Sequence, residues 1–277
     1  MNLSRKILPV VFCLLFLSAA QAQEDSVLYA KDSVIEMDPD PTTAFFQSGK
    51  RIPPSVKTTL LTKSKKIITL VTWLKSDEMK YSDHTLADLD NDGKKELLIS
   101  NFTGGAHCCD EIYIFKSIGI NKYQHVVKLF AGNTEISPDK LLKYNFYEQF
   151  GYFFTCFACG YTDTSDTAPV ETHNIVLKYN KGKLFVITGD KELRSTITDN
   201  LDKLSEQPYE KLDNGLRQDN GLRKEFALNL AVFYYSFGRN LPETQKLFYK
   251  YYKYPDAKKV WAAFVKNLNF VKSDSDF

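Results

Sequence analysis

The chain has 277 residues, with 36 Lys and Arg residues against 34 Asp and Glu residues, and a formal net charge of +2 at pH 7. This balance argues against a function in binding nucleic acid or anionic membranes. With 43% hydrophobic residues the composition is that of a globular chain, and its length allows one large domain or two small ones.

Residues 1–22 have the pattern of a secretory signal peptide. Two basic residues precede an almost wholly apolar run at 7–17, and Ala20 and Ala22 form a small-residue cleavage site. The run is shorter than the ~20 residues that a membrane-spanning helix needs. We therefore expect cleavage after Ala22 and a periplasmic or secreted protein with no membrane span in its mature form.

Strand signals follow an irregular lead-in. Residues 23–60 are polar and rich in prolines, which disfavour helix at the preceding residue. In residues 61–190, β-branched and aromatic segments separated by turn residues predict an antiparallel sheet or sandwich. The predicted strands are 67–74, 97–100, 112–115, 125–130, 152–155, 174–179 and 184–187. The last two form a predicted hairpin with Gly182 in its turn.

Residues 191–277 are predicted to be helical, so the expected fold class is α+β. An apolar stripe at helical spacing starts at Leu222 and includes Phe226, and Gly238 is a suitable stop. Before this stripe the sequence Asp-Asn-Gly-Leu-Arg occurs twice, and Asp219 or Asn220 is expected to cap the helix. Pro242 and Pro255 suit the first turns of two further helices, the last with a stripe at Trp261, Phe264, Val265 and Leu268.

An acidic loop, residues 88–96, has the spacing of a calcium site. Its four acids and a carbonyl stand at relative positions 1, 3, 5, 7 and 9, with Gly93 at position 6; the expected ligands are Asp88, Asp90, Asp92, the Lys94 carbonyl and Glu96. Calcium binds six to eight oxygens from flexible ligands. A solvated acidic turn would explain neither the alternation nor the glycine. Position 12 is Ile99, where an EF-hand needs a glutamate, and the flanking residues indicate a strand.

The segment ADLDNDGKKELLI resembles the calcium loop of FG-GAP or VCBS-type repeats, in which D-x-D-x-D-G-x-x-D/E runs into an apolar strand. The following GGAHCC segment resembles one beside such loops in exported bacterial proteins of unknown function. The resemblance covers about residues 85–115 and implies calcium at the same five ligands, in a β-hairpin. The loop occurs once, so we expect a small sheet or sandwich and not a propeller.

Four cysteines remain after the expected cleavage: Cys108, Cys109, Cys156 and Cys159. An even number in an exported chain predicts two disulfides. Antiparallel register favours pairing Cys109 with Cys156 and Cys108 with Cys159, and the connectivity 108–109 with 156–159 stays open. A soft-metal site with His107 and a redox C-x-x-C are the alternatives to structural disulfides.

These patterns together predict an exported, calcium-binding β-domain with a non-enzymatic binding or structural role, and a protein or glycan partner in the cell envelope. An exported hydrolase is one alternative, because a catalytic triad need not be local in sequence. No nucleophile elbow, zinc-helix signature or Ser-x-x-Lys motif is present, and the four histidines show no metal-ligand spacing. The other alternative is a thiol-redox or soft-metal protein that uses the four cysteines.

Overall fold

The computed structural model describes residues 58–74, 82–102, 110–130, 135–159, 161, 172–213 and 216–277. The expected signal peptide, most of the lead-in, Cys108 and Cys109 lie outside these ranges. Contacts divide the chain into Met1–Asp40 and Pro41–Phe277. All the described residues belong to the second unit.

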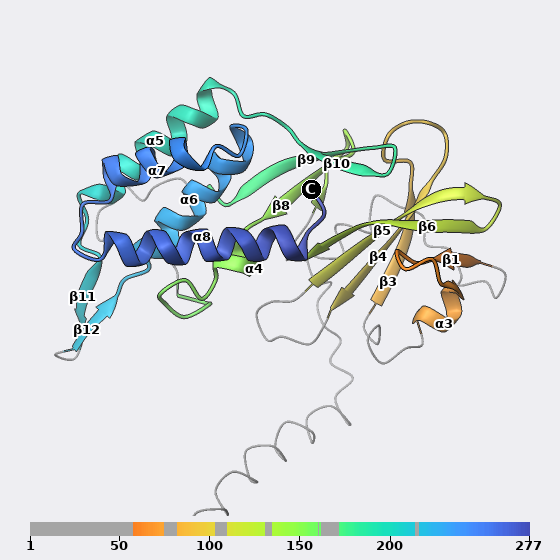
Figure 1. Ribbon diagram of the computed structural model, residues 1–277, viewed down its shortest axis with the longest axis horizontal. Coiled ribbons are helices and arrows are strands. Elements are labelled where there is room, and N and C mark those ends of the chain that lie inside the picture. The colour runs from red at the N-terminus through yellow and green to blue at the C-terminus, as the bar shows by residue number, and fades with distance from the viewer. Residues whose placement is uncertain are drawn as a thin grey trace, which may run out of the picture. The chain divides into compact units, whose positions relative to one another are not determined.

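The larger sheet has six strands in the order β2-β1-β6-β5-β4-β3 (Figure 1). They are β1 (Thr59–Leu61), β2 (Ile67–Thr69), β3 (Ser82–Ala87), β4 (Glu96–Phe102), β5 (Asp110–Gly119) and β6 (Lys122–Phe130). Neighbouring strands are antiparallel except β1 and β6, which are parallel. The predicted strands 97–100, 112–115 and 125–130 are thereby confirmed.

Strand β4 is buried on both faces. Leu98 belongs to the main hydrophobic core, whereas Leu97 and Ile99 belong to a smaller cluster with Leu60 and Phe115. Because successive side chains of a strand point to opposite faces, burial of three consecutive residues requires cover on both sides of the sheet. The apolar run after the acidic loop is therefore a central strand that holds the end of that loop in place.

The smaller sheet has the order β10-β9-β8-β7 and is antiparallel throughout. Its strands are β7 (Glu135–Ile136), β8 (Leu141–Asn145), β9 (Asn174–Asn180) and β10 (Lys183–Val186). The turn between β9 and β10 consists of Lys181 and Gly182, with φ values of 49° and 91°. Two positive φ values favour the tight turn whose twist suits a hairpin. The predicted hairpin is confirmed.

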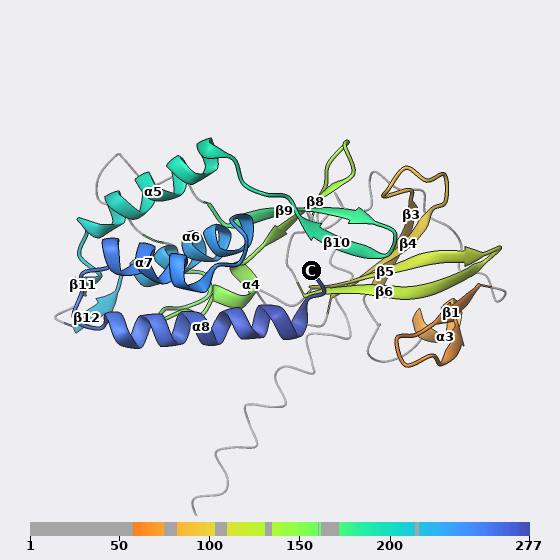
Figure 2. The ribbon, with the colours of Figure 1, turned by 45° about the horizontal axis from the view of Figure 1, so that its top comes forward.

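The helices are α3 (Leu70–Leu74), α4 (Tyr147–Phe150), α5 (Lys191–Ser205), α6 (Leu222–Ser236), α7 (Leu241–Tyr251) and α8 (Ala257–Asp274). Of these, α4, α5, α7 and α8 contact α6 (Figure 2). All residues of α6 are buried, including Arg223, Lys224 and Glu225. Buried charges need hydrogen-bond or ionic partners. The partners of Lys224 include backbone carbonyls in the segment after α4, and these contacts determine the conformation of that segment. The expected α+β class is confirmed, and no described helix is long and apolar enough to cross a membrane.

Two predicted strands are wrong in part or in whole. The strand expected over residues 67–74 stops at Thr69, whose hydroxyl accepts the N–H of Thr72 and starts α3. Residues 152–155 form no strand. There the chain curls so that the carbonyls of Gly151 and Cys156 reach the same buried ammonium of Lys224, which an extended backbone would not allow.

The predicted helical region contains a hairpin, β11 (Glu210–Asp213) and β12 (Leu216–Asp219), between α5 and α6. The second Asp-Asn-Gly then leads into α6. Asp219 accepts the N–H of Gly221 and Asn220 accepts that of Leu222, so both residues support the helix start although Gly221 is the N-cap. Pro242 lies in the first turn of α7, while Pro255 lies two positions before α8.

Candidate functional site

The acidic loop connects β3 to β4, which pair as an antiparallel hairpin up to Ala87 and Glu96. Asp88 organises the loop: its two carboxylate oxygens accept the N–H groups of Asp92 and Gly93, each at 3.1 Å. Gly93 has a φ of 84°, a conformation that glycine adopts without steric cost. The β-hairpin setting expected for this loop is therefore observed.

Three of the predicted ligands converge. One carboxylate oxygen each of Asp88, Asp90 and Glu96 lies within 4.8 Å of the other two. Glu96 is only 2% exposed, and its Oε2 accepts the N–H of Leu89 at 3.0 Å. Burial, together with the nearby charges of Asp90 and Asp92, raises the pKa of Glu96 to about 7. The arrangement can hold a metal ion, and its carboxylates do not by themselves specify which one.

The hairpin of the smaller sheet closes one side of this cluster. Asp90 Oδ2 accepts the backbone N–H of Lys181, 91 positions away, at 2.9 Å. Asp90 Oδ1 is buried and has no hydrogen-bond partner among the described residues. Burial and then the charges of Glu96 and Asp90 raise the pKa of Tyr179. No local sequence signal could have indicated Tyr179 or Lys181, because β9 and β10 meet the loop only in the folded chain.

The carboxylate of Asp92 lies outside the group of three. Its Oδ1 accepts the N–H of Lys94 at 2.8 Å, which tightens the second half of the loop. The structure thus brings together Asp88, Asp90 and Glu96, and it places the Asp92 carboxylate in the same loop outside that group. Lys94, whose carbonyl is the fifth predicted ligand, lies in the same loop.

The preferred disulfide pairing is wrong. Cys156 is bonded to Cys159, with their Cα atoms 5.1 Å apart, so neither is available to Cys108 or Cys109. The register argument failed because the segment before Cys156 is not a strand. The observed bond belongs to the third connectivity, whose other half lies outside the described residues.

A buried polar network lies on α6 and includes one of the four histidines. His173 Nε2 lies 3.1 Å from both carboxylate oxygens of Glu225. Asn229 donates to Glu225, and Asn200 of α5 donates to Asn229 and to Thr172. The network connects α5, α6 and the chain before β9, which is the arrangement expected for polar groups that must be satisfied inside a core.

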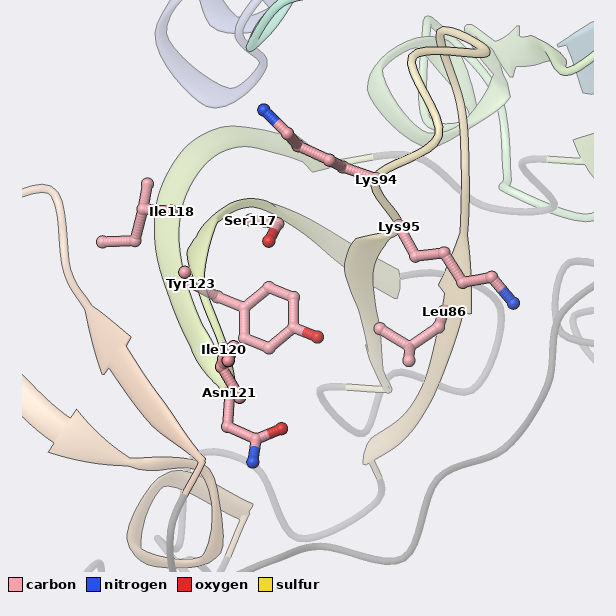
Figure 3. Close-up of a pocket in the computed structure, with 9 residues that line it drawn as sticks. Leu86, Lys94, Lys95, Ser117, Ile118, Ile120, Asn121 and Tyr123 are labelled. Atoms are coloured by element: carbon pink, nitrogen blue, oxygen red, sulfur yellow. The ribbon is translucent and has the colours of Figure 1, made fainter.

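A cavity of about 660 Å³ lies beside the acidic loop, between Lys94, Lys95 and the tip of the β5–β6 hairpin. Figure 3 shows the ring of Tyr123 inside it, with the side chains of Lys94 and Lys95 extending in opposite directions. The two ammonium groups therefore do not converge on a common anion. The acidic cluster remains the stronger candidate site.

No protein-family model, curated protein or solved structure matches this chain. The case for a function therefore rests on the geometry of its own residues.

The raised pKa of Glu96 predicts a pH dependence in the ion-free protein. Between its ordinary value of 4.5 and about 7, the folded protein retains a proton that the unfolded chain has released. This contribution to stability is complete below pH 4.5 and is lost as the pH rises through 7. We therefore compare the wild type with the Glu96→Gln variant in the presence of chelator. As the pH rises, the free energy of unfolding of the wild type should fall relative to that of the variant by up to about 1.4 kcal/mol per pH unit.

Chemical denaturation at several pH values measures this difference. Burial lowers the pKa of His125 from 6.5 to about 4. Between these two pH values His125 therefore makes the free energy of unfolding rise with pH, whereas Glu96 makes it fall. The His125 contribution is common to both proteins and cancels in their difference. A difference that does not change between pH 4.5 and 7 would contradict the prediction.

Proposed function

We propose that this chain is an exported calcium-binding protein with a binding or structural role in the cell envelope. In this proposal the ion fixes the acidic loop of the larger sheet against the β9–β10 hairpin of the smaller one. The observation that carries it is the convergence of Asp88, Asp90 and Glu96 at the point where Asp90 contacts Lys181.

Two features of the cluster support a bound cation. The buried Oδ1 of Asp90 has no hydrogen-bond partner among the described residues, and a buried acceptor without a partner costs about 1–3 kcal/mol. Glu96 is nearly inaccessible and lies close to two other acids, so its ionised form is disfavoured. A cation among these oxygens would provide the missing partner and favour the ionised carboxylate.

The donor set favours calcium over other metals. The convergent atoms are all carboxylate oxygens, and hard oxygen ligands suit calcium or magnesium better than metals that prefer sulfur or imidazole. Calcium tolerates irregular geometry, whereas magnesium requires a near-ideal octahedron. The Lys94 carbonyl, Asp92 and water would complete the coordination, as in the FG-GAP or VCBS-type loops that the segment resembles.

Export is supported by the N-terminal sequence pattern and by the bond between Cys156 and Cys159. Disulfides persist mainly in oxidising compartments. A calcium site of this kind is suited to such compartments, where calcium modules bind with dissociation constants of ~10⁻⁴–10⁻³ M.

Thermal unfolding with calcium, magnesium or chelator tests the proposal. A hundredfold excess of calcium over its dissociation constant should stabilise the fold by about 2.7 kcal/mol, which corresponds to a melting-temperature increase of about 5–10 °C. The double substitution Asp90→Asn with Glu96→Gln should abolish the response. Both replacements keep an acceptor oxygen for the backbone N–H groups of Lys181 and Leu89, so they remove charge with little change in shape.

Asp199→Asn is the matched control, since Asp199 is an exposed acid on α5 far from the cluster in sequence. It should retain the full calcium response, and magnesium should stabilise the wild type much less. The calcium proposal would fail if the wild-type melting temperature were indifferent to millimolar calcium, or if the double variant responded like the wild type.

A further inference from the structure

The disulfide between Cys156 and Cys159 is exposed and very short in sequence. Both residues are exposed, and they stand three positions apart. A bridge that closes so small a loop removes little entropy from the unfolded chain and so stabilises the fold less than a long-range bridge. Exposure also allows an attacking thiolate to reach the sulfur atoms. These properties suit exchange chemistry better than structural stabilisation.

The backbone around this bridge is held by contacts that do not involve sulfur. Lys224, which is only 2% exposed, donates from Nζ to the carbonyl oxygens of Gly151, Cys156 and Phe157, each at 3.0 Å. Tyr147 lies at the same distance from Nζ and donates its hydroxyl to Phe157. The loop after α4 (green in Figure 1) is thus anchored on the buried helix α6.

Close packing supports the same conclusion. A Cβ atom on Gly151 would lie 2.3 Å from the ring of Phe157 and 2.8 Å from the carbonyl oxygen of Tyr147, so the loop folds back on a position that only glycine can occupy. Across the bridge, the N–H of Cys159 donates to the carbonyl of Cys156. These contacts would keep the two cysteines close together after reduction.

A lysine ammonium contacts the backbone of one of the two cysteines. Residues 151–159 contain no acid, and the Lys224 ammonium is bonded within the loop itself. Lys259 and Arg223 lie 5.4 and 5.5 Å from the ring of Phe154. Arg223 is paired with Asp219 and Asp256. Among the described residues, the unpaired cation in direct contact with the backbone of Cys156 is therefore Lys224. Positive surroundings lower the pKa of a cysteine thiol and increase its reactivity.

We propose that Cys156 and Cys159 form a thiol–disulfide exchange site, whose substrates are thiols of small molecules or of other exported proteins. A substrate thiolate attacks one sulfur of the bridge, forming a mixed disulfide and releasing the other cysteine as a thiolate that takes up a proton. A second substrate thiolate then attacks the substrate sulfur of the mixed disulfide. The substrate leaves as a disulfide, and the protein gains two electrons and two protons as a dithiol.

Reduction of the native protein in glutathione buffers tests the proposal directly. After alkylation, trypsin releases residues 144–178, which contain Cys156 and Cys159 and no other cysteine, whereas Cys108 and Cys109 lie in residues 96–116. We expect the 144–178 peptide to be reduced in buffers that leave structural disulfides oxidised. A bridge that stays oxidised until the protein unfolds would overturn the proposal.

Variants separate exchange from stabilisation. Cys156→Ser and Cys159→Ser should each accumulate a mixed disulfide with glutathione, and the wild type should accelerate the reduction of insulin by glutathione where the double variant does not. The double variant should lose less than about 4 °C in melting temperature. A larger loss, or no acceleration by the wild type, would assign the bridge to stability and overturn the proposal.

The exchange site and the proposed calcium site share no residue. Chelator should therefore leave the reduction of the 144–178 peptide unchanged, and the Asp90→Asn with Glu96→Gln variant should exchange at the wild-type rate. If one of the two proposals fails its test, the other can still be tested independently.

Discussion

Replacing Lys224 by Met is expected to lower the free energy of unfolding by about 3–5 kcal/mol. Met preserves most of the side-chain volume on α6 and removes the ammonium group. The carbonyls of Gly151, Cys156 and Phe157 then lose their shared donor, and each acceptor left buried without a partner costs about 1–3 kcal/mol.

The expected loss is smaller than the sum of these penalties for two reasons. Phe157 still accepts a hydrogen bond from the Tyr147 hydroxyl, and Cys156 still accepts one from the N–H of Cys159. Burial also lowers the pKa of Lys224 to about 8, which means that burying the ammonium is itself unfavourable and that its removal recovers part of that cost. Breaking one side of a buried charged arrangement nevertheless costs about 3–5 kcal/mol in other proteins.

Urea denaturation of the wild type and two variants measures this effect. Lys258→Met is the control, because Lys258 is exposed on α8 and substitutions at such positions change stability by no more than about 0.5 kcal/mol. Equal stability of the two variants would show that the Lys224 ammonium does not hold the loop after α4.

Truncating Phe226 to Ala is expected to cost about 3–5 kcal/mol. Phe226 is fully buried on α6, and its ring packs edge-to-face against Tyr252 with ring centroids 5.1 Å apart. The surrounding helices cannot collapse easily into the space, because α6 is packed against α5, α7 and α8. The loss therefore includes both the transfer energy of the ring and the cavity left behind.

Trp261→Ala should cost less than Phe226→Ala although the tryptophan is larger. Trp261 is only partly buried, against the rings of Phe248 and Phe264, so less of its surface leaves water on folding. Phe185→Ala is the control of the same residue type, since Phe185 is 51% exposed on β10. Chemical denaturation should rank the three losses as Phe226, Trp261, Phe185, and a Trp261 loss equal to that of Phe226 would contradict the packing described here.

Local sequence patterns predicted the structure correctly where the conformation that neighbouring residues favour is also the one that the tertiary contacts require. The turn at Gly182 needs positive φ, and the sequence provides the residue that adopts it. The stripe from Leu222 to Phe233 needs burial, and the helix that carries it is buried on every side. The acidic alternation in residues 88–96 likewise reports a loop, because Asp88 folds it through contacts only four and five residues away.

Local sequence patterns gave wrong predictions where contacts with a residue distant in sequence override the backbone conformation that the neighbouring residues favour. The aromatic run at residues 152–155 has the composition of a strand, but Lys224 draws the carbonyls around it to a single point. The preferred cysteine pairing assumed that strand and failed with it. Neither outcome was accessible from the run itself, since Lys224 lies 68 positions beyond Cys156.

The sequence by itself determined the α+β class, the β9–β10 hairpin, the long helix at Leu222 and the presence of an acidic loop before a buried strand, because each depends on residues that are neighbours along the chain. The tertiary structure decided which acids converge, that Asp90 reaches Lys181, and that Cys156 bonds to Cys159 above a buried ammonium. The contacts of Asp90 with Lys181 and of Lys224 with Cys156 join residues 91 and 68 positions apart, and only packing of the two sheets and α6 brings their atoms within bonding distance. The acids and the two cysteines are close in sequence, but the conformation that brings their side chains together depends on these long-range contacts.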